Sequence, residues 1–135
     1  MSHAEIKLLR SINIDTMCIS LRSDGLMQVV VEPGACSTVQ NIKEATEAIG
    51  KVGEGKRYPL LIIAGKDSTM DTEAMAFLAK KDSTPYTLAV AGLIVSISQK
   101  LLGNFYLNFN KPQKPTKIFT KKEEAVIWLE QFRES

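Results

Sequence analysis

Hydrophobic and polar residues alternate near the start of the chain, in a pattern that predicts an antiparallel pair of strands. Apolar side chains occupy every second position over residues 15–22, as in a strand with one buried face. Asp24-Gly25 then predicts a type I′ hairpin turn, because both central positions of that turn need a positive φ. A second strand is expected over residues 26–32.

A helical period replaces the alternation after residue 37. The apolar residues that share one helical face are Val39, Ile42, Ala45, Ile49 and Val52. Gln40 follows Ser37 by three positions, as in a capping box, so the first helix is expected to begin near residue 37 or 38. Three glycines between residues 50 and 55 are expected to end it.

Short apolar runs and helical segments alternate through the rest of the chain. The expected elements are a strand at 60–64, a helix at about 71–81, a strand at 86–93, a helix from Ser96 or Ser98 to about 108 or 109, a strand at 116–119 and a closing helix that a capping box at 120–123 begins. Such alternation implies crossover connections and parallel strands. We therefore predict an α/β fold with a single mixed, mostly parallel sheet and helices in the order ββαβαβαβα. It is expected to be one domain over residues 14–133, after a flexible N-terminal segment of residues 1–13.

Composition fits such a domain. The chain has 135 residues, of which 44% are hydrophobic and 24% charged, and these values are ordinary for a globular protein. A net charge of +2 is too small to argue for nucleic acid or membrane binding. No apolar run approaches the roughly 18 residues of a membrane span, and the N-terminus lacks the apolar region of a signal peptide. A cytoplasmic protein is expected.

Cysteine and histidine usage argues against several kinds of chemistry. The spacing of Cys18 and Cys36 matches no zinc or thioredoxin-type motif, so both are interpreted as structural. His3 is the sole histidine and falls in the segment expected to be frayed, which removes the commonest general base and metal ligand from the folded body. No metal site, no cofactor and no enzymatic activity are predicted. Asp67 and Asp71 are the only candidate pair of catalytic carboxylates, and no activated nucleophile supports them.

Polar residues at 66–73 join the end of a central strand to the second helix. Carboxylates and hydroxyls there are suited to cap the helix N-terminus. Residues 62–78 also resemble the signature segment of STAS domains, the domains of anti-sigma-factor antagonists. In that family an Asp-Ser pair opens the helix, and a partner kinase phosphorylates the serine.

That resemblance places Asp71 on the family aspartate and Thr72 on its phosphoacceptor, with Ser68 and Thr69 as rival acceptors. Glu73 departs from the family pattern, because a carboxylate beside Thr72 would repel an added phosphate. The resemblance implies a candidate switch or partner-binding segment that a kinase or regulator contacts.

A second resemblance rests on the C-terminal third. The stretches 102–112 and 115–120, followed by an acidic pair and Trp-Leu, are similar to those of small bacterial proteins labelled STAS/SEC14-like. The resemblance implies a STAS-like fold and a family of unassigned biochemical role.

Apolar residues cover more of the third helix than one sheet-facing side requires. The candidate dimer or ligand surface comprises Leu102, Phe105, Tyr106 and Phe109. It is explained by a homodimer, which we favour, by a groove for a lipid-like ligand, or by cover from residues 110–115. Gly103 costs about 1 kcal/mol in helix propensity, which suggests close packing at that position.

Residues 83–122 contain no Asp or Glu but several lysines. Lys100, Lys111 and Lys114 would form a basic rim for an anionic ligand or acidic partner if they converged, and otherwise belong to a solvated face. Nucleic acid binding is not expected, because the aromatic residues have helical core spacing.

Two functions follow from these patterns. The first is a non-enzymatic regulatory or protein-interaction module of STAS-like type that self-associates. The alternative is a small-molecule or lipid-binding protein with an apolar groove and a basic rim.

Overall fold

A six-stranded mixed sheet forms the centre of the computed structural model, which describes residues 5–134. The strand order is β1-β2-β3-β5-β7-β8, where the strands are β1 (Leu8–Ile14), β2 (Met17–Arg22), β3 (Met27–Val31), β5 (Tyr58–Ile63), β7 (Thr87–Leu93) and β8 (Thr116–Phe119). The pairs β1–β2 and β2–β3 are antiparallel, and every later neighbour is parallel. The predicted mixed, mostly parallel sheet is confirmed. A separate two-stranded sheet pairs β4 (Cys36–Ser37) with β6 (Thr69–Met70).

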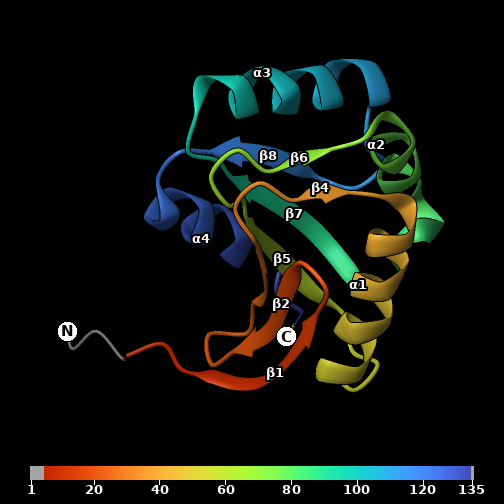
Figure 1. The fold of residues 1–135 in the computed structure, drawn as a ribbon. Helices are drawn as coiled ribbons and strands as arrows, with labels where there is room; N and C mark the ends of the chain where they lie inside the picture. The colour runs from red at the N-terminus through yellow and green to blue at the C-terminus, as the bar shows by residue number, and fades with distance from the viewer. Residues whose placement is uncertain (1–4, 135) are drawn as a thin grey trace.

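Four helices lie around the sheet (Figure 1). They are α1 (Val39–Val52), α2 (Thr72–Ala79), α3 (Ile97–Phe105) and α4 (Lys122–Glu130), and short turns η1 (Lys81–Ser83) and η2 (Tyr106–Asn110) follow α2 and α3. Helix α1 packs on β1 and β2 and beside α2, whereas α4 packs on β5, β7 and β8 from the opposite face. Helix α3 lies apart from the others, beyond β6 and β8, where Figure 1 shows no element on its far side.

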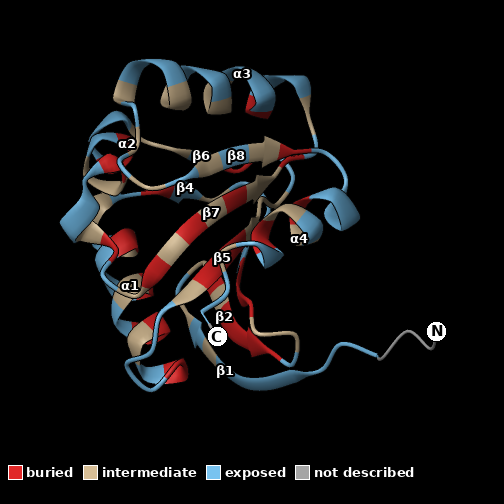
Figure 2. Ribbon diagram, turned by 180° about the vertical axis from the view of Figure 1, so that it is seen from behind, coloured by how far each residue is buried: buried red, intermediate tan, exposed pale blue. Residues whose placement is uncertain are grey.

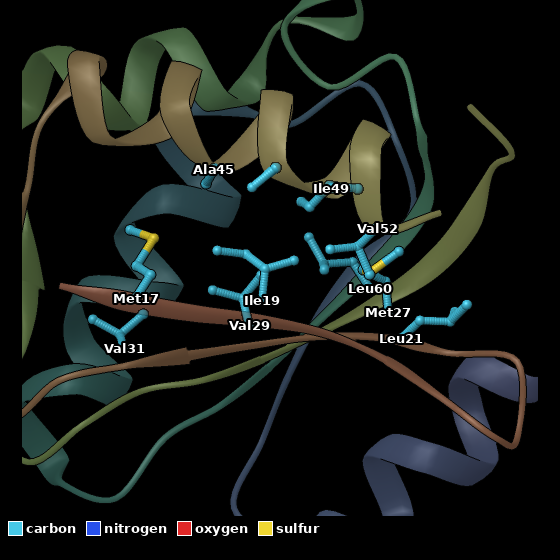
Figure 3. Close-up of a cluster of buried hydrophobic side chains, with 11 residues drawn as sticks. Met17, Ile19, Leu21, Met27, Val29, Val31, Ala45, Ile49, Val52 and Leu60 are labelled. Atoms are coloured by element: carbon cyan, nitrogen blue, oxygen red, sulfur yellow. The ribbon is translucent and has the colours of Figure 1, made fainter. Parts of the chain in front are cut away.

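Two hydrophobic clusters fill the space between the sheet and its helices. Alternation along each strand divides them, because Leu60 faces α1 and Leu61 faces α4. Side chains of β2, β3 and α1 point toward one another in the first cluster (Figure 3). The second cluster places Leu129 of α4 against Leu61, with Trp128 packed at its edge. Figure 2 shows the resulting buried strip through β2, β5 and β7.

Strand β1 lies almost wholly within residues 1–13, the segment that the sequence pattern predicts to be flexible. Its apolar alternation is weak because it is an edge strand, and Leu8 remains 54% exposed. Pairing with β2 over six residue pairs holds it, and Arg10 Nε donates to Val52 O at 2.9 Å. The folded part of the chain therefore begins earlier than the predicted boundary at residue 14. His3 lies outside the described residues.

Three local predictions also need correction. Gly25 has a φ of 81° but Asp24 has no positive φ, so the hairpin has a three-residue loop, closed by Gly25 N–H to Arg22 O at 3.1 Å, instead of a type I′ turn. Helix α1 is capped by Thr38 with Asn41, because Ser37 belongs to β4. Helix α4 begins one residue later than predicted and has no side-chain cap.

Candidate functional site

An apolar cavity of about 150 Å³ lies between the sheet, α2 and α3, and it is partly open to solvent. The strands contribute mainly aliphatic side chains and Gly92, and the helical segments around α2 and α3 contribute the rest. The main apolar lining residues are Val31, Ile62, Val90, Leu93, Ile94, Ile118, Met75, Leu78, Leu102 and Tyr106. Hydroxyl and amide groups complete it, from Ser37, Ser68, Thr69, Gln99 and Thr116. Within residues 5–134, no charged side chain lines this cavity.

Helix α3 touches the sheet at Gly103. A Cβ at this position would lie 3.1 Å from Cγ1 of Ile118 on β8, closer than ordinary van der Waals contact, so any larger residue would require the Ile118 side chain to shift. Ile118 also lies against Gly92 of β7, where a Cβ would meet Cδ1 of Ile118 at 3.1 Å. The close packing that the sequence suggested for Gly103 is therefore present, and α3 crosses the sheet as the outer wall of the cavity.

Gln99 fastens the first turn of α3 to the loop that follows β5. Its side chain is only 6% exposed, and its Nε2 donates to Gly65 O at 2.8 Å and Ser68 O at 3.2 Å. The Val95 N–H donates to Gln99 Oε1 at 2.9 Å. Gly65 itself lies so close to the end of β3 that a Cβ would be 2.4 Å from Val31 O. Gln99 is thus a central positioning residue of the site.

Sequence reasoning missed Gln99, although a signal for it exists. Gln99, Leu102, Gly103 and Tyr106 follow the spacing i, i+3, i+4, i+7 of one helical face. A glutamine on a face that is otherwise apolar or small indicates a buried polar contact, because an unpaired amide in a core is costly.

The loop before α2 acts as a helix cap. Asp71 Oδ1 accepts from the Ala74 N–H at 2.7 Å, which confirms the capping interpretation. Thr72 is the first residue of α2 and is exposed, and Thr69 is exposed on β6. Ser68 is buried beneath Gln99. Phosphorylation at Thr72 stays a prediction.

The predicted surface on the third helix divides between two sides. Leu102 and Tyr106 line the cavity. Phe105 and Phe109 lie outside it, exposed and stacked on each other with ring centroids 4.9 Å apart. Cover by residues 110–115 does not explain the outer side, because Phe109 remains 70% exposed. Burial raises the pKa of the Tyr106 phenol.

The three lysines do not form one rim around the cavity. Lys114 Nζ donates to Thr84 O, and burial lowers the pKa of Lys114, as do the nearby charges of Arg57 and Lys81. Lys111 and Lys114 border a shallow groove at the far end of α3, whereas Lys100 is exposed on α3 itself. None of the three lysines lines the cavity, and convergence of Lys100, Lys111 and Lys114 on one surface stays a prediction.

This mixed sheet, with four helices around it, defines a STAS-like α/β fold. The chain belongs to the family described as "Domain of unknown function (DUF7793)", whose family model matches residues 19–133. The fold is similar to that of an uncharacterised protein of the DUF3478 family with a SpoIIAA-like fold, from Shewanella loihica PV-4. That likeness has a TM-score of 0.53 at 16% identity and covers 96% of this chain and 98% of the other.

The predicted STAS-like fold and a family of unknown function are thereby confirmed. No curated protein matches the chain. In the part of the chain that the structure describes, no helix has both the length and the apolar character needed to cross a membrane.

Proposed function

We propose that this domain is a non-enzymatic binding module that holds a small, uncharged, mostly apolar molecule in the cavity between the sheet, α2 and α3. The observation that carries the proposal is the cavity itself, with its volume of about 150 Å³ and its uncharged lining within residues 5–134. An apolar cavity of this order accommodates a benzene-sized molecule.

The expected affinity follows from the volume. Filling such a cavity recovers roughly 24 cal/mol per Å³, or about 3.6 kcal/mol for the whole space. This corresponds to a Kd of a few millimolar for a bare hydrocarbon probe. A larger ligand that extends through the open side, or one with a hydrogen-bonding group, would bind more tightly.

Tyr106 supplies the polar contact in this proposal. A phenol is protonated at neutral pH, so the Tyr106 hydroxyl is a hydrogen-bond donor there, and burial raises its pKa further. A carbonyl, ester or ether oxygen on the ligand would satisfy it. A carboxylate suits the cavity less well, because burying an anion without a cationic partner is costly.

We propose no enzymatic activity because of where the two candidate catalytic carboxylates, Asp67 and Asp71, lie. Neither Asp67 nor Asp71 lines the cavity, and Asp71 is occupied as the cap of α2. A regulatory role is compatible with ligand binding, because the cavity wall includes Thr69 and Met70, which directly precede Asp71 and Thr72. Ligand and partner would then act on the same segment. Self-association remains a prediction from the sequence.

Titration of toluene and acetophenone, followed by methyl NMR of the full chain, tests the proposal. Both probes are expected to shift the methyl signals of Met75, Leu102 and Ile118. The variant L102F places a ring in the cavity and is expected to weaken binding at least tenfold. The matched control L101F makes the same change at the neighbouring exposed position and is expected to bind as wild type does. Equal binding by both variants, or no saturable shift in the wild type, would refute the proposal.

A further inference from the structure

The far side of α3 carries a row of exposed apolar residues. Ile97, Leu101 and Phe105 of α3 and Phe109 of the following η2, here called the α3 outer row, recur every four positions and are all exposed, with Ile97 80% accessible. None of them lines the cavity, whereas their neighbours Leu102 and Tyr106 do. Helix α3 is therefore apolar on two sides, although only one side packs on the protein.

Helix α3, which carries most of this row, lies at the periphery of the fold. Figures 1 and 2 show α3 at the periphery, with exposed residues along its outer side. Exposed apolar residues in a contiguous patch mark a contact site, because scattered single residues are the normal case. The stacked rings of Phe105 and Phe109 make the patch continuous toward the end of the helix.

The charged residues near the row favour an anionic partner over a second copy of the same helix. Residues 95–111 carry two lysines, Lys100 and Lys111, both exposed, and no acidic residue. A twofold contact between two copies of α3 would bring four positive charges together with no carboxylate in the helix to oppose them. The nearest loop, after β5, adds Lys66 and Asp67, which offset each other. The row therefore suits an anionic occupant.

We infer that the α3 outer row docks on an anionic lipid surface. Apolar and aromatic side chains on one side of a helix enter the boundary between headgroups and acyl chains, while lysines at its margin contact lipid phosphates. The same helix forms a wall of the cavity, so a membrane would be the source of the apolar ligand; this last point alone rests on the proposed function.

Flotation of the full chain with vesicles tests the inference. The protein is expected to float with vesicles of phosphatidylcholine containing phosphatidylglycerol, and much less with phosphatidylcholine alone. At about 1 kcal/mol per lysine near an anionic surface, the double variant K100Q–K111Q is expected to lose about 30-fold in partitioning. High salt is expected to weaken wild-type binding in the same direction.

The apolar contribution has a matched control. L101S–F109S is expected to lower the bound fraction at least tenfold, whereas I127S, which alters an exposed apolar residue on α4, is expected to bind as wild type does. All positions are exposed, so folding should survive, and circular dichroism checks this.

Lack of flotation with any vesicle would overturn the inference. A dimer that L101S–F109S converts to monomer in sedimentation, without vesicle binding, would also overturn it and assign the row to a second copy. Toluene binding by the same variants reports on the cavity separately, so failure of the docking surface is distinguishable from failure of the proposed function.

Discussion

Replacing Gln99 by leucine removes the side chain that fastens α3 over the cavity. The leucine side chain has a similar volume but neither donates nor accepts hydrogen bonds. Ser68 O and the Val95 N–H would therefore be left without a hydrogen-bond partner among the described residues. Gly65 O is less affected, because it also accepts from the Ser68 N–H at 3.0 Å. The loss therefore falls on the buried carbonyl of Ser68 and on the part-buried N–H of Val95.

The magnitude follows from those two groups. Leaving a buried backbone group unsatisfied costs about 1–3 kcal/mol, so the free energy of unfolding is expected to fall by about 3 kcal/mol. For 135 residues the unfolding entropy is about 0.28 kcal/mol per kelvin, and the Tm is therefore expected to fall by about 10 °C. A domain with a stability of roughly 5–15 kcal/mol remains folded.

Calorimetry measures the change in Tm, and hydrogen exchange of the α3 amides shows where it acts. Q40L is the control, because Gln40 is exposed on α1 and its side chain forms no hydrogen bond within residues 5–134. Its Tm should stay within about 2 °C of wild type, since exposed substitutions cost at most about 0.5 kcal/mol. If Q99L has the Tm of Q40L and keeps its α3 protection, then Gln99 does not hold the helix in place.

Three further predictions concern the same region. G103A is expected to destabilise by about 1–2 kcal/mol despite the better helix propensity of alanine, because its Cβ meets Ile118, and I118V should recover part of the loss in urea unfolding. Y106F is expected to weaken acetophenone binding about fivefold, one hydrogen bond's worth, and to leave toluene binding unchanged in the NMR titration. The pKa of Tyr106 is higher in the folded than in the unfolded protein, so its contribution to stability is present below the ordinary tyrosine pKa and is lost as the pH rises above it. The Tm of wild type should therefore fall more steeply above about pH 10 than that of Y106F. D71A is expected to lose about 1 kcal/mol with the cap of α2, whereas T72A at the next, exposed position should change stability by less than about 0.5 kcal/mol; equal losses would contradict the capping geometry.

The order of strands and helices was accessible from the sequence because each element has a strong period. The helical spacing in α1 matches the side chains that the structure buries. The alternation in β2 predicted a strand correctly but not its single buried face, because Ser20 and Arg22 on the polar side are buried as well. Strand β1 lacked that signal, because an edge strand with exposed Leu8 and Leu9 has no clean alternation. The N-cap of α1 is Thr38, one residue later than the predicted Ser37, because Ser37 belongs to the short strand β4.

The site was less accessible, because a cavity depends on the distance between elements that are far apart in the chain. The excess of apolar residues on α3 was visible, and so was the unusual Gly103, but only the fold separates the inner Leu102 and Tyr106 from the outer Phe105 and Phe109. The position of Lys114 could not be predicted from the sequence for a similar reason. Lys114 contacts Thr84, thirty residues earlier, and no local pattern reports such a pairing.

The most direct test of the central claim is a crystal structure of the wild-type protein under xenon pressure. Xenon enters apolar cavities without needing polar partners. We predict a xenon atom between the sheet and α3, in contact with Ile118, Met75 and Leu102. A space filled by rearranged side chains, with xenon absent there or bound only elsewhere, would contradict the existence of a ligand cavity in this domain.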